Sequence, residues 1–255
     1  MTTEAERLLV DIARCPNVAA CLGSGSEGHA CWQIVLHQGV SQVAAFQVPE
    51  PWSGDLTHAP ILFVSSNPSW DPGEDYPHAG WPDELIIDFF MNRFGNGRKE
   101  WVKDGVRPLL SNGEHPTGWV RFWAAARSRS TELLGRPACP GVDFALTEVV
   151  HCKSTKEIGV DDATAKCSDQ WLLRVLSCAG ASLIVTLGKP ASKTVRSVLQ
   201  LDPVGKVVGP SMMAGKTRML ISLPHPNAWV AKTVASLEAA DRLKATQFLR
   251  RSTGD

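Results

Sequence analysis

The 255-residue chain contains no stretch that approaches the roughly 20 consecutive apolar residues needed for a membrane-spanning helix. Its first residues, MTTEAERLLVDIARC, are acidic and amphipathic, unlike the basic and apolar start of a secretory signal. We therefore expect a cytoplasmic protein with no membrane partner. In a reducing compartment, the seven cysteines indicate metal ligands or free thiols rather than disulfides.

The chain also lacks net charge, because 26 basic residues balance 26 acidic ones, so it has no global signature of nucleic-acid binding. The two signs are nevertheless distributed unevenly. From Leu187 onward, lysine and arginine far outnumber aspartate and glutamate. This excess suits a surface that faces phosphates, and an ordinary solvated helix face accounts for it equally well.

Internal repeats and long linkers are absent, and short apolar runs alternate with stretches of helical spacing. The runs predict strands at residues 61–64, 144–150, 183–187, 204–208 and 218–223. The helical stretches are residues 3–14, 83–94, 117–134, 161–179, 190–199 and 233–251. This alternation predicts an α/β fold, a single three-layer domain with a mostly parallel central sheet flanked by helices.

We expect one domain over residues 1–255, divided into a covering segment and a core. The covering segment, residues 1–58, carries cysteines and precedes the first core strand. Within it, residues 32–48 are expected to form a strand pair or an irregular layer. Residues 59–255 form the core.

The segment 59–73, APILFVSSNPSWDPG, organises this core. Its apolar run stops abruptly at Ser65-Ser66-Asn67, and Pro68 and Pro72 then prevent the chain from entering a helix at once. Ligands of open α/β sheets bind at the carboxyl ends of the strands. We therefore expect these three polar side chains to face a binding crevice, with an ordinary strand-to-loop turn as the alternative.

Polar groups also follow two other predicted strands. Glu148 ends one of them, and His225 follows another between two prolines that fix its backbone. An asparagine such as Asn67 can orient a water through its amide, and a fixed histidine can stabilise an anion that develops on a leaving group. A structural or solvent-facing histidine is the alternative for His225.

The cysteines form two groups that are far apart in the sequence. Cys15 and Cys21 lie near the N-terminus, and Cys152 and Cys167 lie 15 residues apart in the core. Four thiolates from two distant segments suit an iron–sulfur cluster or a zinc ion, and buried apolar cysteines are the alternative. Cys31 is placed so that it can replace either N-terminal ligand.

The order of these motifs resembles that of the uracil-DNA glycosylase superfamily, and within it the branch that carries a 4Fe-4S cluster. The run ILFVSSNPS resembles the family's G-x-N-P-G motif, with Asn67 at its asparagine. The segment TEVVHC, residues 147–152, is similar to the family's T-N-V-V-K-C, and Cys167 stands where its fourth cluster cysteine lies. His225-Pro226-Asn227 matches its H-P-S motif. The resemblance spans residues 15–232.

The resemblance implies a DNA N-glycosylase of base excision repair, which hydrolyses the N-glycosidic bond of a deaminated or damaged base, uracil or a related base. The base would be flipped out of the DNA into the pocket at the strand ends. Asn67 would orient the water or hold the sugar-side edge, and His225 would stabilise the departing base anion. Ser65 and Ser66 would contact the base, on which Tyr76, Trp81 or Phe89 would stack.

The same resemblance implies that Asn227, Trp229 and Lys232 belong to a loop that penetrates DNA. It also implies that Cys15, Cys21, Cys152 and Cys167 hold the 4Fe-4S cluster. DNA is thus the expected partner, and we expect a monomer.

The sequence departs from the family's pattern in three respects. Ser65 and Ser69 replace flanking glycines, and the first cysteines are spaced C-x5-C rather than C-x2-C. Glu148 replaces the asparagine that reads the base, and an ionised glutamate only accepts hydrogen bonds whereas an amide also donates them. This favours either a base that presents donors or a pocket in which Glu148 is protonated.

Two other functions are compatible with these departures. A non-catalytic module for nucleic-acid binding or damage recognition would retain the scaffold without cleaving a base. A hydrolase of free nucleosides would suit the neutral net charge.

Overall fold

A five-stranded sheet in the order β4-β1-β5-β7-β6 forms the centre of the computed structural model, which describes residues 3–23, 25–95 and 97–254. Four strands are parallel, and β6 runs antiparallel at one edge. The strands are β1 (Ile61–Ser65), β4 (Phe144–Glu148), β5 (Leu183–Leu187), β6 (Val207–Met213) and β7 (Lys216–Leu223). The predicted α/β class and the mostly parallel sheet are confirmed.

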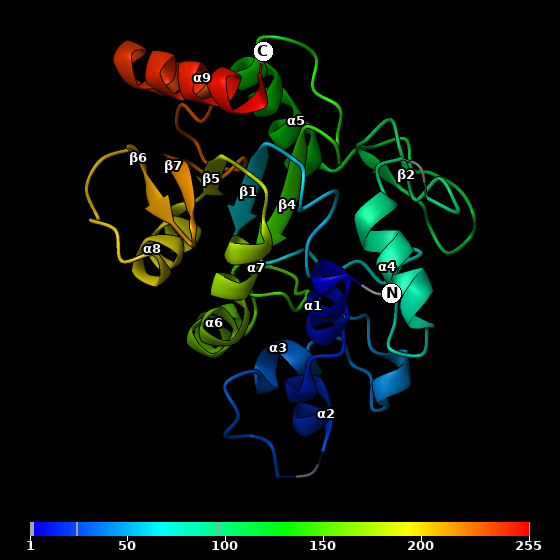
Figure 1. Cartoon of the computed structure of the whole chain (residues 1–255). Coiled ribbons are helices and arrows are strands. Elements are labelled where there is room, and N and C mark those ends of the chain that lie inside the picture. The colour runs from blue at the N-terminus through cyan, green and yellow to red at the C-terminus, as the bar shows by residue number, and fades with distance from the viewer. Residues whose placement is uncertain (1–2, 24, 96, 255) are drawn as a thin grey trace.

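Helices cover the sheet in a three-layer arrangement. They are α1 (Glu4–Ala13), α2 (Pro16–Leu22), α3 (Trp32–Leu36), α4 (Asp83–Asn92), α5 (Arg121–Leu134), α6 (Val160–Cys167), α7 (Leu173–Cys178), α8 (Lys189–Val198) and α9 (Ala239–Thr253). Helix α8 packs on β5 and β1, and α5 packs on α9. Figure 1 shows α5 and α9 grouped at the top of the view and α1 to α3 at the bottom, with the sheet between them.

Local sequence explains where the main elements begin and end. Every residue of β1, β4 and β5 is buried, as expected for strands covered on both faces. Helix α1 begins at a capping box, in which Thr3 and Glu6 bond to each other's backbone N–H. Helix α5 ends at Gly135, whose φ of 70° is the left-handed conformation that glycine adopts most readily.

The structure corrects several predicted boundaries. Residues 32–48 form no strand pair, because helix α3 and the 3-10 turn η1 (Val43–Ala45) occupy much of the segment. The helix predicted at 161–179 is divided by the π-turn η2 (Ser168–Leu172) into α6 and α7. Residues 233–238 precede the last helix and contain the 3-10 turn η3 (Val234–Ser236). A small hairpin of β2 (Val102–Lys103) and β3 (Arg107–Pro108) lies between α4 and α5.

The parallel register determines which residues meet at the edge of the sheet. Ser65 pairs with Glu148 at the carboxyl ends of β1 and β4. Leu187 and Leu223 pair at the ends of β5 and β7, so the chain that follows β7 emerges at the same edge. Among the described residues, no helix is both long and apolar enough to cross a membrane.

Candidate functional site

A cavity of about 600 Å³ opens at the carboxyl ends of β1 and β4. It is lined by Ser65, Ser66 and Asn67 from the end of β1, by Glu148 from β4, and by His225 from the loop after β7. The structure therefore brings the polar groups of three strand ends together on one cavity. Shared strand direction explains this convergence, since parallel strands end at the same edge of a sheet.

The amide of Asn67 is held from one side. Its Nδ2 donates hydrogen bonds to the carbonyl oxygen of Pro68 (2.9 Å) and to the hydroxyl of Ser154 (3.2 Å). The backbone of Ser154 is in turn bonded to Pro68, because its N–H donates to that carbonyl at 3.1 Å. This fixes the NH₂ group of Asn67 toward the protein and leaves its carbonyl oxygen free to accept a hydrogen bond from a water or a substrate.

His225 is arranged as a neutral hydrogen-bond donor. Its Nδ1 accepts a hydrogen bond from the backbone N–H of Asn227 at 3.2 Å, which places the ring proton on Nε2. Partial burial lowers the pKa of His225, and the nearby cations Arg129 and Lys232 act in the same direction. The ring stacks on Phe122, with centroids 6.3 Å apart and planes inclined by 25°.

Arg129 of α5 secures the loop that carries His225. Its guanidinium donates to the carbonyl oxygens of Pro224 and Lys232, before and after the histidine. Lys232 also donates from Nζ to the carbonyl oxygen of Ala228 at 3.1 Å. Trp229, between these anchors, is fully exposed at the surface of the loop.

A network of buried charges forms the floor of the cavity. Arg93 donates to Glu50 at 3.2 Å and to Glu74 at 2.7 Å, and Lys153 donates to Glu74 at 2.8 Å. Tyr76 adds a hydrogen bond to Glu50 at 3.3 Å. Two cations therefore neutralise two carboxylates, and the buried ion pairs retain their charges because each has partners.

Glu148 lies beside this balanced network without a cation of its own. The side chain is 3% exposed, and its Oε2 is a buried atom without a hydrogen-bond partner among the described residues. Burial is the main cause that raises the pKa of Glu148 well above its ordinary value, and the nearby Glu50 adds to it. Burial and Glu50 favour the protonated form of this carboxyl group, against the opposing attraction of Arg93 and Lys153. In that form it can both donate and accept a hydrogen bond.

The aromatic residues predicted to stack on the base do not line the cavity. Tyr76 and Phe89 are buried behind its wall, in edge-to-face contact with centroids 5.1 Å apart. Trp81 packs on Phe89 in the same cluster. The aromatic rings that do line the cavity are Phe122 and Trp123, at the start of α5.

Several residues of this site could hardly be recognised from the sequence. Glu50, Arg93, Glu74 and Lys153 come from four distant segments, and no local spacing links them. Phe122 and Trp123 belong to a helical aromatic stripe, a pattern that ordinarily marks the core. The sequence feature that could have pointed to the charged residues is an isolated charge in apolar surroundings, such as Glu50 between two prolines.

One wall of the cavity is a strained loop. Lys156 and Glu157 have φ values of 54° and 59°, in the left-handed region that favours glycine. Glu157 accepts a hydrogen bond from the hydroxyl of Ser66 at 2.8 Å. Strain of this kind is concentrated at ligand-binding positions, where the surrounding structure holds it in place.

Five buried cysteines gather between the N-terminal segment and the core: Cys15, Cys21, Cys31, Cys152 and Cys167. The pKa of Cys152 is raised, first by burial and then by the four other thiols, which places all five in one neighbourhood. Burial, with a smaller contribution from neighbouring thiols, raises the pKa of Cys31 to about 11 and that of Cys167 to about 12. Within the described ranges, no group of three histidine, cysteine, aspartate or glutamate side chains stands in a metal-binding arrangement. The donor set is thus the one that an iron–sulfur cluster uses, although the thiols are not closed around a common centre.

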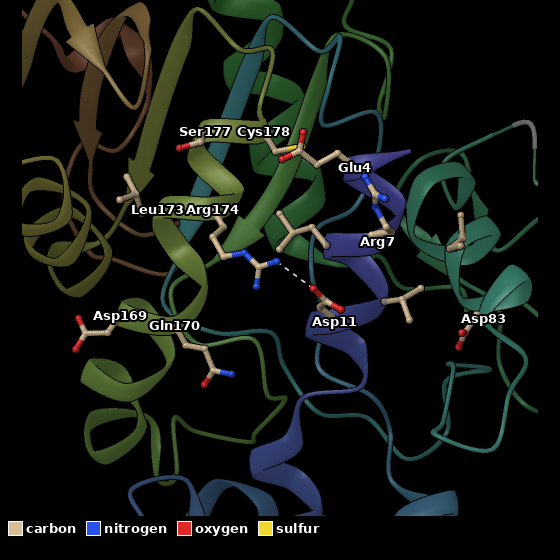
Figure 2. Close-up of a pocket in the computed structure, with 13 residues that line it drawn as sticks. Glu4, Arg7, Asp11, Asp83, Asp169, Gln170, Leu173, Arg174, Ser177 and Cys178 are labelled. Atoms are coloured by element: carbon tan, nitrogen blue, oxygen red, sulfur yellow. Dashed lines mark hydrogen bonds and ion pairs between the residues drawn. The ribbon is translucent and has the colours of Figure 1, made fainter. Parts of the chain in front are cut away.

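A separate cleft of about 870 Å³, away from the candidate site, lies between α1 and the segment η2–α7 (Figure 2). The ion pair between Arg174 and Asp11, 3.0 Å long, crosses it. None of the residues that the sequence indicates as functional lines this cleft, and its charged groups are largely exposed.

Comparison of the chain with protein-family models gives no match, and neither does comparison with curated proteins.

The protonation of Glu148 leads to a stability prediction. A carboxyl whose pKa is raised by folding stabilises the protein fully below its ordinary value of 4.5, and this stabilisation is lost as the pH rises toward the folded-state pKa. The loss amounts to about 1.4 kcal/mol for each pH unit in that window. Glu148→Gln, which mimics the neutral acid, should abolish the loss, so the melting temperature of the variant should rise relative to that of the wild type as the pH increases above 4.5.

Other titrating groups are common to both proteins and cancel in this difference. Glu114→Gln, on an exposed loop, is the matched control and should show a difference that does not change with pH. A pH-independent difference for Glu148→Gln as well would mean that Glu148 is ionised in the folded protein.

Proposed function

We propose that the protein is a DNA N-glycosylase of base excision repair, which hydrolyses the N-glycosidic bond of a deaminated or damaged base. The observation that carries the proposal is the convergence of Asn67, Glu148 and His225 on one cavity at the strand ends. The resemblance of their motifs to the uracil-DNA glycosylase superfamily supports it. The target nucleotide would enter this cavity after leaving the base stack.

Asn67 and His225 have different roles in the hydrolysis: Asn67 acts on the water and His225 acts on the departing base. The free carbonyl oxygen of Asn67 accepts a hydrogen bond from a water and orients its oxygen toward the sugar carbon that bears the base. When the N-glycosidic bond breaks, its electron pair remains on the base, and the Nε2–H of His225 stabilises the resulting anion. Hydrolysis adds the hydroxyl of the water to the sugar carbon and its hydrogen to the base.

Glu148 selects the base. A protonated carboxyl offers one donor and one acceptor, as does the amide of the asparagine that the superfamily has at this position. This restores the hydrogen-bonding pattern needed for uracil or a related base, in spite of the change of residue. Ser65, paired with Glu148 across the strands, completes the polar edge of the pocket.

The buried thiols support a 4Fe-4S cluster that fastens the N-terminal segment to the core. Cys15, Cys152 and Cys167 are three of its ligands, and Cys31 is better placed than Cys21 to be the fourth. The thiol of Cys31 raises the pKa of both Cys152 and Cys167, so it is near both. The thiol of Cys21 raises the pKa of Cys152, and its Sγ lies 3.2 Å from Nδ1 of His29. The cluster serves the fold, since no cysteine lines the cavity of about 600 Å³ that holds Asn67 and His225.

The loop after His225 provides a contact with DNA. Asn227 lines the cavity, Trp229 projects fully from the surface, and Lys232 lies at the anchored end of the loop. The excess of basic residues after Leu187 suits a partner with phosphates. We place this activity in the cytoplasm, in a monomeric protein.

The test of the proposal is single-turnover excision from oligonucleotides that each carry one modified base, with protein purified without oxygen. His225→Ala should lower the excision rate about 100- to 1,000-fold, the usual effect of removing one fixed donor to a developing anion. Asn67→Ala should also lower the rate, because the attacking water loses the oxygen that orients it. The exposed residues His58 and Asn112 provide the matched controls His58→Ala and Asn112→Ala, whose rates should equal that of the wild type.

The same screen separates the alternatives. Salt-dependent DNA binding without excision of any base would contradict the glycosylase and favour a binding module. Cleavage of free nucleosides without cleavage of oligonucleotides would favour the nucleoside hydrolase.

The cluster has an independent test. Protein purified without oxygen should be brown and contain about four irons per chain. Cys152→Ala and Cys31→Ala should lose the iron and unfold at lower temperature, because the cluster joins two distant segments. The exposed Cys139 supplies the control, and Cys139→Ala should keep its iron. Colourless wild-type protein without iron or zinc would show that the five thiols are core residues.

A further inference from the structure

A second cavity of about 1030 Å³ adjoins the candidate site. It is bounded by α8, by the turn at residues 201–206 and by the chain that follows β7. Ser66, Glu157, His225 and Asn227 line both cavities, so the two share a wall. A ligand group bound in the second cavity would therefore lie directly beside one bound in the first.

The rim of this second cavity is cationic. Lys189, Lys193 and Lys206 line it, are exposed, and have side chains without an ion pair or hydrogen bond among the described residues. Helix α8 begins at Lys189, and the N-terminus of a helix favours an anion. Arg196 is different, because its guanidinium is used to brace the turn through the carbonyl oxygens of Asp202 and Gly205.

The interior is apolar. Pro190, Leu201, Pro203, Leu223 and Val230 contribute to its walls, and Val230 remains exposed. Its volume is at the upper end of the roughly 300–1,000 Å³ that small-molecule sites occupy. An apolar interior with a rim of free lysines matches a ligand that has a flat, weakly polar body and a phosphate.

We infer that this cavity binds a second nucleotide, with its base against the apolar walls and its phosphate against the lysines. Resting on the proposed function, the inference identifies this nucleotide as the neighbour of the flipped one in the same strand. The shared wall is the reason, since consecutive nucleotides of one strand must occupy adjacent sites. The neighbour's base must then leave its own partner, so the protein favours single-stranded or unpaired DNA.

The test measures binding of five-nucleotide single strands by fluorescence anisotropy. The central nucleotide carries the excised base with a 2′-fluoro sugar, so that the strand remains intact. In two further strands, the neighbour on the 5′ side or on the 3′ side lacks its base. Removing the neighbouring base on one side only should weaken binding about 5- to 150-fold, the range found when a base loses its contact with a protein.

Variants of the cavity connect this effect to its walls. Ser197 lines the cavity from an exposed position of α8, and Ser197→Trp should fill it and abolish the dependence on the neighbour. Ser197→Ala is the matched control and should retain the dependence. Lys193→Ala should reduce the slope of log affinity against log salt by about one unit, and Lys244→Ala, on α9, should not.

Equal affinity for all three strands would overturn the inference, as would a one-sided dependence that a folded Ser197→Trp variant retains. If Ser197→Trp does not fold, the triple replacement of Lys189, Lys193 and Lys206 by alanine takes its place. That variant should lose affinity for the full strand, and removal of the neighbour's phosphate should then weaken its binding no further, whereas the same removal should weaken binding to the wild type.

Two further outcomes separate the inference from the proposed function. Excision that is indifferent to the neighbouring base would leave the glycosylase intact and refute the second site. Dependence of binding on the neighbour without excision of any base would support the second site and contradict the glycosylase. Competition by deoxyadenosine monophosphate against the wild type but not against Ser197→Trp would assign the cavity to free nucleotides.

Discussion

The buried ion network of Glu50, Glu74, Arg93 and Lys153 is the constraint on which the site depends. Two carboxylates and two cations neutralise one another below the cavity. An ion removed from water is stable only with such partners, so each member holds the others in place. The network also joins the segment before β1 to α4 and to the chain after β4. It thereby positions the base of the cavity from three sides.

The network also affects the protonation of Glu148, because its two cations are paired with Glu50 and Glu74. Arg93 and Lys153 are both paired with other carboxylates, and burial beside Glu50 favours the neutral form of Glu148. A neutral acid in this position does what an amide would do in a conventional pocket. His225 follows a similar logic, because burial and nearby cations keep its ring neutral while a backbone N–H selects its tautomer. The carboxyl group of Glu148 and the ring of His225 are thus both suited to donate hydrogen bonds in their neutral forms.

Much of the fold was predictable from the sequence, because apolar runs and helical spacing are local signals. The five strands and the parallel direction of four of them followed from such runs. The gathering of Ser65, Asn67, Glu148 and His225 also followed, since it requires only that parallel strands end at one edge. Of the two alternatives expected at residues 32–48, a strand pair or an irregular layer, the strand pair was wrong, because a short helix and a 3-10 turn lie there. Tyr76 and Phe89 were expected at the cavity, yet they pack beneath it against the buried network. Contacts of this kind join distant segments, and no spacing in the sequence reveals them.

Titration of Glu148 by carbon-13 NMR, in protein with labelled glutamate side chains, tests most directly whether this residue is a neutral acid facing the cavity. Comparison with Glu148→Gln identifies its carboxyl resonance. We expect this resonance to keep the chemical shift of a protonated acid at pH 7 and to change only at higher pH. Titration of the resonance near the ordinary value of 4.5 would show that Glu148 is instead an ionised carboxylate at neutral pH.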